Sequence, residues 1–442
     1  MSTTTPQSTT PAAVPPPAKS PKDAQKDFAM VRQKELIQAH FEKLRHARQN
    51  GQKVVYTFVP GNLVELLLSF DLVPAYPEIH ALQAGMRQAS DKYIREAERI
   101  GHSEDVCSYV KSDVGMGLAG DIGVDGTKIP PPDLLLLSST GCATFFKWFE
   151  NLRRQHNAES VMLQVPYIAD GSTPTKEHID YVVRQLKEDV IPVLERVSGK
   201  KFDEARLAKL LEKSAVAEDY LVKTLELGKR TPSPIDAYFG AVYYVGPIFT
   251  SYRGTQEAVD YYKGLYEETL ARAEAGLGPV TPDGPLKKER FRLVVEGTPC
   301  WTSFRDIWRM FANEGAVVVA STYSKVGGLY DQGFRHDPKR PLETLAEYCM
   351  GCYTNISLPA RLDLLAKYGK DYDADGFVVH SVKSCKAFGA GQVLLLRELE
   401  KRTGKPACFL ESDLVDSRYF SAAHFKNRLE SYLQAVDLRR KS

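Results

Sequence analysis

The sequence repeats one pattern that restricts its fold: a short apolar run, a loop of small or turn-forming residues, and a segment with helical spacing. Residues 53–59 (KVVYTFV) are such a run, the turn 60–62 follows, and 63–70 begins a helix. The other expected strands are 73–76, 133–138, 160–165, 292–296, 316–320, 376–380 and 406–410. A strand that reaches the next strand through a helix is the building unit of a parallel sheet. The pattern therefore predicts an α/β fold.

The strand-helix pattern is interrupted once, which suggests the domain organisation. Residues 176–228 are long, polar and helical in spacing, and 235–275 are also mainly helical. Pro192 is expected to kink or end its helix. We therefore expect an N-terminal α/β domain at 24–170, a helical segment at 171–288 and a C-terminal α/β domain at 289–442.

Composition excludes several classes of protein. Residues 1–23 are mostly Ser, Thr, Pro and Ala, so we expect a disordered tail rather than a signal peptide, on a cytoplasmic protein. No apolar run approaches 18 residues, so no membrane span is expected. Lys and Arg number 58 against 56 Asp and Glu, and this balance gives no reason to expect a nucleic acid partner.

Seven cysteines in a chain without a secretion signal are expected to be free thiols. Cys107, Cys142 and Cys385 each stand beside the end of an expected strand or the start of an expected helix. Ligands of open parallel sheets bind outside the carboxyl ends of the strands, and a helix N-terminus favours a thiolate. Three thiolates also suffice to hold a cubane iron–sulfur cluster with one iron left open. Simple packing of the three side chains is the alternative.

The remaining cysteines are weaker candidates for ligands. Cys349 and Cys352 form a C-x-x-C pair, but no second pair or added histidine follows at the spacing of a zinc site, so two buried side chains are the favoured interpretation. Cys408 lies within an apolar run and is expected in the core. Cys300 follows an expected strand, and it either faces a cofactor pocket or packs.

Other candidates lie around Cys385. His380 is a candidate proton donor, and the alternative is a hydrogen-bonded histidine at a strand end. Lys383 and Lys386 either offset charge at the site or are solvated. No G-x-x-x-x-G-K-[ST] motif occurs, so we expect no phosphate-binding loop in this chain.

Several strings in order resemble the 2-hydroxyacyl-CoA dehydratase and benzoyl-CoA reductase family, from about residue 28 onward. They are EDVC at 104–107, STGC at 139–142, DGFVV at 375–379 with SC at 384–385, and PGNLVE at 60–65 with LVP at 72–74. Likeness around GTPCW at 297–301 and EYCMGC at 347–352 places the chain nearer the reductase branch.

The resemblance implies two flavodoxin-like (Rossmann-like) parallel-sheet domains with a helical insertion, and a [4Fe–4S] cluster held by Cys107, Cys142 and Cys385. It also implies a heterodimer with a related cluster-bearing subunit, and a separate ATP-hydrolysing iron–sulfur component that passes on electrons from ferredoxin. The expected activity is reduction of an aromatic acyl-CoA such as benzoyl-CoA to a cyclohexadienoyl-CoA. The alternatives are a subunit of a 2-hydroxyacyl-CoA dehydratase and a non-catalytic electron-relay subunit.

Overall fold

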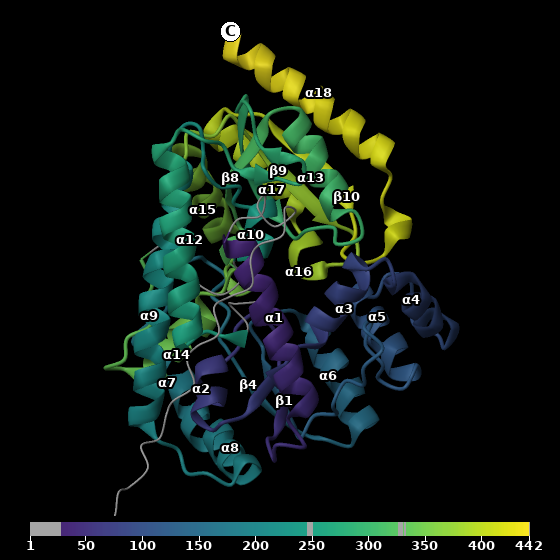
Figure 1. Cartoon of the computed structure of the whole chain (residues 1–442), viewed down its shortest axis with the longest axis vertical. Helices are drawn as coiled ribbons and strands as arrows, with labels where there is room; N and C mark the ends of the chain where they lie inside the picture. The colour runs from purple at the N-terminus through teal and green to yellow at the C-terminus, as the bar shows by residue number, and fades with distance from the viewer. Residues whose placement is uncertain (1–27, 245–250, 326–329, 331–332, 442) are drawn as a thin grey trace, which may run out of the picture.

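A computed structural model describes residues 28–244, 251–325, 330 and 333–441. It contains two four-stranded parallel sheets, which occupy the lower and upper halves of Figure 1. The first has the order β2-β1-β3-β4 and the second β10-β9-β7-β8. The strands of the first sheet are β1 (Val54–Tyr56), β2 (Val73–Ala75), β3 (Leu134–Ser138) and β4 (Glu159–Leu163). Those of the second are β7 (Phe291–Gly297), β8 (Ala316–Ser321), β9 (Gly376–Val382) and β10 (Ala407–Ser412).

Both sheets are built in the same way. The second strand in sequence pairs on one side of the first, and the third and fourth strands continue on the other side. This is the strand order of a flavodoxin-like sheet, which places a topological switch point between β1 and β3 and another between β7 and β9. The expected α/β class with two flavodoxin-like parallel sheets is confirmed.

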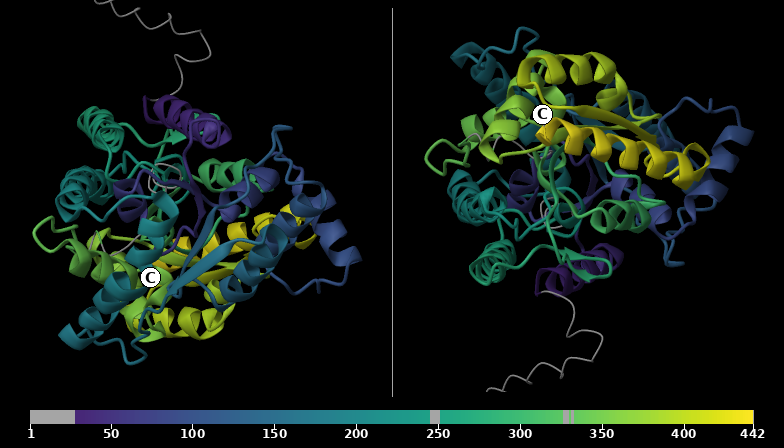
Figure 2. Two further views of the ribbon diagram at one scale, coloured as in Figure 1. Left: turned by 90° about the horizontal axis from the view of Figure 1, so that it is seen from below. Right: turned by 90° about the horizontal axis from the view of Figure 1, so that it is seen from above.

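Helices cover both faces of each sheet, as a parallel sheet requires. In β7, Leu293 and Val295 belong to one apolar cluster, whereas Val294 between them belongs to another. The first cluster takes in α13 (Phe304–Asn313) and α18 (Ala422–Lys441), and the second takes in α15 (Leu358–Asp371) and α17 (Gln392–Thr403). Seen from above in Figure 2, α17 and α18 lie on opposite sides of the strands.

The remaining α-helices of eight or more residues fall into two groups. Around the first sheet are α1 (Phe28–His46), α3 (Pro77–Met86), α4 (Ser90–Arg99), α5 (Ser108–Leu118) and α6 (Ala143–His156). Between the two sheets in sequence are α7 (Lys176–Gln185), α8 (Ile191–Ser198), α9 (Glu204–Glu226) and α12 (Gln256–Glu274). Helix α14 (Pro341–Met350) follows β8. Short helices are α2 (Val64–Ser69), α10 (Phe239–Tyr244) and α16 (Lys386–Gly389). A small antiparallel pair, β5 (Val280–Thr281) and β6 (Gly284–Pro285), lies between α12 and β7 in the sequence.

The segment between the two sheets is helical, as its spacing predicts. Helices α9 and α12 run side by side along one edge of the molecule (Figure 1). The helix before Pro192 ends at Gln185, and a π-helical turn at Leu186–Val190 leads into α8. Proline lacks the N–H that an unbroken α-helix needs there, so the expected interruption is confirmed. The domain limits at 170 and 288 stay predictions, and the expected tail at 1–23 lies outside the described residues.

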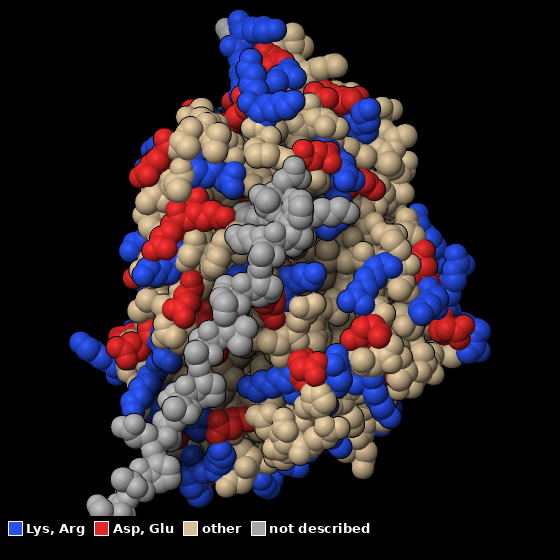
Figure 3. All heavy atoms as spheres, in the orientation of Figure 1, with Lys and Arg blue, Asp and Glu red and all other residues tan. Residues whose placement is uncertain are grey.

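The expectations about membrane spans and surface charge can both be compared with the described residues. In the described parts of the chain, no helix combines the length and the apolar character needed to cross a membrane. On the face shown in Figure 3, basic and acidic side chains are intermixed, apart from a group of basic side chains at the top, where α18 ends. This distribution agrees with the near-equal numbers of the two kinds.

Candidate active-site cavity between the two sheets

A cavity of about 140 Å³ lies where the carboxyl ends of the two sheets face each other. Residues that follow β1 and β3 form one wall, among them Val59 and Cys142. Residues that follow β7, β9 and β10 form the other, among them Trp301, Cys385 and Leu414. Each sheet therefore presents its strand ends, the usual ligand-binding edge of such folds, to one shared space.

Cys107, Cys142 and Cys385 all line this cavity, as the sequence suggested for a converging set. Each is the residue immediately before a helix: Cys107 before α5, Cys142 before α6 and Cys385 before α16. All seven cysteines are free thiols, and these three are partly exposed whereas the other four are buried. The fold thus directs three thiols from both sheets toward the same opening.

The electrostatics of two of these thiols reflect how they are enclosed. Burial raises the pKa of Cys107, and the nearby Cys385 raises it further, while the backbone N–H groups of Val110 and Tyr109 act in the opposite direction. Burial likewise raises the pKa of Cys385 to about 12, and Cys142 is among the groups that raise it. The thiols are therefore close enough to influence one another. The raised pKa values keep Cys107 and Cys385 protonated when no cation is bound, and a coordinated metal would displace these protons.

The arrangement differs from that of a site for a single ion. Within the described ranges, no three His, Cys, Asp or Glu side chains converge closely enough to bind one metal ion. A cubane cluster has a different requirement, because each thiolate binds a different iron and the ligands stand around the cluster. Three thiols that border one small cavity, with backbone N–H groups directed at two of them, fit that requirement.

Glu78, in the first turn of α3, also lines the cavity, and the sequence reasoning missed it. It is 8% exposed, and its Oε2 accepts a hydrogen bond of 2.6 Å from the backbone N–H of Val59. Burial raises the pKa of this carboxyl from 4.5 to about 8. Among the described residues that border the cavity it is the one carboxyl group, and it holds a proton at neutral pH. The available signal was a lone acid between apolar residues just after a strand.

The rest of the lining is largely aromatic and aliphatic. Tyr109, Phe145, Trp301, Tyr323 and Phe388 contribute rings. A second cavity of about 260 Å³ shares Val59, Ile79, Leu82, Trp301 and Tyr323 with the first and extends toward α1 and α10. The two cavities have a common wall of apolar side chains, which suits a flat apolar group and disfavours bulk water.

His380 is placed differently from the expectation that it donates a proton. It is buried and does not line the cavity; its Nδ1 lies 2.6 Å from Tyr238 Oη and its Nε2 lies 2.7 Å from Ser412 Oγ. Burial lowers its pKa to about 4, so the ring is neutral at physiological pH. The structure therefore favours the alternative of a hydrogen-bonded histidine, because both ring nitrogens already have partners.

The four other cysteines are packed. Cys349 and Cys352 are fully buried, and the Cys349 thiol donates to the carbonyl of Gly61 at 3.4 Å. Cys408 lies in the apolar core of the second sheet, as expected. Cys300 is in the same core and does not border the cavity; its neighbour Trp301 does. The favoured interpretation of the C-x-x-C pair as two buried side chains is confirmed.

The two lysines beside Cys385 are exposed. Lys386 borders the cavity, whereas Lys383 places its ammonium group 4.2 Å from the centre of the Tyr419 ring. Both lysines also line an open hollow on the outer side of Cys385, together with His424.

A sequence profile described as "2-hydroxyglutaryl-CoA dehydratase, D-component" matches residues 57–436, a range that contains all three thiols and Glu78. The chain belongs to this family. It is 58% identical over 423 residues to a benzoyl-CoA reductase subunit of Thauera aromatica, and the match covers 96% of this chain and 98% of that protein. It is 26% identical over 385 residues to the (R)-phenyllactyl-CoA dehydratase alpha subunit of Clostridium sporogenes, covering 87% of this chain and 89% of that one. The (R)-2-hydroxyisocaproyl-CoA dehydratase alpha subunit of Clostridioides difficile is also 26% identical, over 425 residues, covering 95% and 98%.

Proposed function

We propose that this chain is a subunit of an oxidoreductase that reduces the ring of an aromatic acyl-CoA such as benzoyl-CoA to a cyclohexadienoyl-CoA. The much higher identity to a reductase subunit than to dehydratase subunits favours this reaction. The observation that carries the proposal is the convergence of Cys107, Cys142 and Cys385 on one apolar cavity between the sheets. These three thiols would hold a [4Fe–4S] cluster.

The cluster would supply the electrons, which must have a very low potential to reduce an aromatic ring. The protein would set that potential through net charge, hydrogen bonds and solvent exposure. The chain's own residues have other tasks. The aromatic side chains around the thiols would hold the ring of the substrate and exclude water, which would otherwise quench a reactive intermediate.

Reduction of a benzene ring to a diene adds two electrons and two protons, so the site needs a proton source. Glu78 fits this task, because it borders the cavity and its raised pKa keeps it protonated at neutral pH. A general acid works best with a pKa near the working pH. We assign one of the two protons to Glu78 and none to His380.

The electrons would come from a separate ATP-hydrolysing iron–sulfur component supplied by ferredoxin, and a related cluster-bearing subunit would complete a heterodimer. The relatives are themselves named as subunits, which supports a heteromeric assembly.

The ligand assignment is tested by replacing single cysteines in the complex purified without oxygen. Cys107→Ser, Cys142→Ser and Cys385→Ser should each lower the iron and acid-labile sulfide of this subunit and abolish ring reduction. Cys408→Ser is the matched control, because Cys408 packs in the core of the second sheet and should keep both. Full iron content in the three variants would overturn the assignment.

Turnover distinguishes the reaction types. ATP use in proportion to diene formation supports the reductase, whereas catalytic ATP with formation of an enoyl-CoA from a 2-hydroxyacyl-CoA indicates a dehydratase. A complex in which the acyl-CoA contacts the related subunit's cluster alone indicates that this chain relays electrons.

A further inference from the structure

We propose that Asp413 is a positioning residue that fixes Cys107 and Cys385 relative to each other and places negative charge beside the group they hold. The inference rests on the proposed function, since it concerns the thiols assigned there as ligands. Asp413 follows β10 directly and is fully buried.

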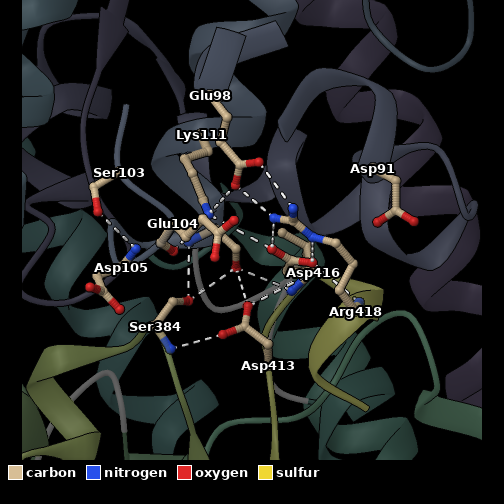
Figure 4. Close-up of polar contacts among 12 residues, drawn as sticks. Asp91, Glu98, Ser103, Glu104, Asp105, Lys111, Ser384, Asp413, Asp416 and Arg418 are labelled. Atoms are coloured by element: carbon tan, nitrogen blue, oxygen red, sulfur yellow. Dashed lines mark hydrogen bonds and ion pairs between the residues drawn. The ribbon is translucent and has the colours of Figure 1, made fainter. Parts of the chain in front are cut away.

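The carboxylate joins the residues adjacent to the two cysteines. Asp413 Oδ1 accepts a hydrogen bond of 2.5 Å from the hydroxyl of Ser108, and Oδ2 accepts one of 2.8 Å from the backbone N–H of Ser384. The backbone N–H of Ser108 in turn donates to Ser384 Oγ at 3.1 Å. Ser108 follows Cys107 in the first half of the chain, and Ser384 precedes Cys385 in the second. One buried side chain therefore connects thiol-bearing segments from the two halves of the chain, and Figure 4 shows its bond to Ser384.

The loop that carries Asp413 is itself fastened to the first half of the chain. Lys111, in α5, is fully buried; its Nζ donates to Glu98 at 2.8 Å and lies 3.7 Å from Asp416 Oδ2. Arg418 bonds the same two carboxylates, Glu98 at 2.6 Å and Asp416 at 2.6 Å. Figure 4 shows these four charged side chains in contact with one another above the Asp413–Ser384 pair. The two positive and two negative charges of this group balance. Asp413 lies outside the group and bonds the residues next to Cys107 and Cys385.

Charge is the second part of the inference. Asp413 bonds Ser108 and Ser384, which are the chain neighbours of Cys107 and Cys385, so its charge lies close to both sulfurs. The same negative charge disfavours the addition of an electron to any cluster held by these sulfurs. A cluster beside Asp413 is therefore a stronger reductant than one beside a neutral side chain, as reduction of an aromatic ring requires.

The test uses Asp413→Asn in the whole complex purified without oxygen, with the iron content and the midpoint potential of the cluster as readouts. Asparagine keeps the size and one oxygen that can accept from Ser108, but it removes the charge and replaces the acceptor of the Ser384 N–H by an amide NH2. The potential should become more positive, with the one-electron equilibrium shifted toward the reduced cluster by at least about tenfold, or about 59 mV. Asp91→Asn is the matched control. Asp91 accepts a hydrogen bond of 2.6 Å from Ser417 Oγ across the same boundary, but among the described residues it bonds none that adjoins a thiol. The cluster potential of this variant should equal that of the wild type.

Ser108→Ala separates geometry from charge, because it removes the hydroxyl bond to Asp413 and leaves the carboxylate. This variant should lose iron to a chelator several times faster than the wild type. If Asp413→Asn holds a cluster of wild-type potential, the proposal is wrong. If Asp413→Asn holds no iron and Ser108→Ala loses iron at the wild-type rate, it is also wrong. A wild-type subunit without any cluster would instead refute the proposed function, so the two failures are distinguishable.

Discussion

Replacing Glu78 with Gln tests the chemistry of the cavity through a single proton. The substitution keeps the size of the side chain and an oxygen that can accept the hydrogen bond from Val59 N–H. What it removes is a carboxyl group whose pKa is raised by burial from 4.5 to about 8. A difference of one in pKa corresponds to about 1.36 kcal/mol, so ionising Glu78 in place costs the folded chain up to about 5 kcal/mol.

The sign of the pH dependence follows from the direction in which the pKa moves. Between pH 4.5 and 8 the folded chain keeps the Glu78 proton and the unfolded chain loses it, so this group lowers stability as the pH rises through that window. Glutamine has no proton to lose. The variant should therefore gain stability relative to the wild type between pH 5 and 8, by up to about 4 kcal/mol.

The assay compares thermal unfolding of the two proteins at matched pH values, prepared and measured without oxygen. The other buried carboxyls are present in both, so their contributions cancel in the difference. Ring reduction by the assembled complex gives an independent readout: the wild-type rate should fall as the pH rises above about 8, and the variant should lose roughly 100-fold or more at all pH values. A difference in melting temperature that does not change with pH, together with an unchanged rate, would refute the reasoning.

Three other substitutions are expected to act through packing and burial. His380→Gln should lower stability but leave the pH profile of ring reduction unchanged; a loss of roughly 100-fold or more, the usual contribution of a general acid, would restore His380 as a proton donor. Arg253→Leu leaves the fully buried Glu65 without its ion-pair partner at 2.5 Å, and unfolding measurements should show a loss of about 3–5 kcal/mol. Gly297→Ala places a Cβ 2.2 Å from the carbonyl oxygen of His380 at a φ of +123°, so unfolding should show a loss of more than about 1 kcal/mol, and an unchanged melting curve would contradict that geometry.

The sheets were predictable because their strands are short apolar runs bounded by turn-forming residues. The run at 133–138, for example, follows three prolines and precedes Ser-Thr-Gly, so it is too short for a core helix. The exact ends of the strands were not predictable. The run at 53–59 pairs only over Val54–Tyr56, because the chain then leaves the sheet to bury Phe58 and to bring Val59 to the cavity.

Helix α5 was missed for an identifiable reason. Gly115 and Gly117 lie within α5, and glycine in a helix costs about 1 kcal/mol, so the sequence pattern does not favour a helix there. In the structure Gly115 allows close packing of α5 against α4, because a Cβ at this position would lie 2.1 Å from the carbonyl oxygen of Tyr93 in α4. The two helices cross too closely for any side chain, and that requirement exists only in three dimensions.

The site was partly predictable. Helix and strand boundaries directed attention to Cys107, Cys142 and Cys385, and all three border one cavity. Glu78 and Asp413 were not found, because an ordinary acidic residue gains its significance from burial and neighbours far along the chain. The prediction of His380 as a proton donor rested on its closeness to Cys385 in sequence, which says nothing of Tyr238, the hydrogen-bond partner of one of its ring nitrogens.

Because the two sheets face each other across the cavity, the cavity can form only late in the synthesis of the protein. The cavity takes one wall from segments near Val59 and Cys142 and the other from segments that end at Leu414. A ribosome must therefore finish almost the entire polypeptide before the chamber exists at all. A prosthetic group bound by all three thiols can be completed only after Cys385 has been synthesised, and a chain truncated before β9 would keep Cys107 and Cys142 but lack the third thiol.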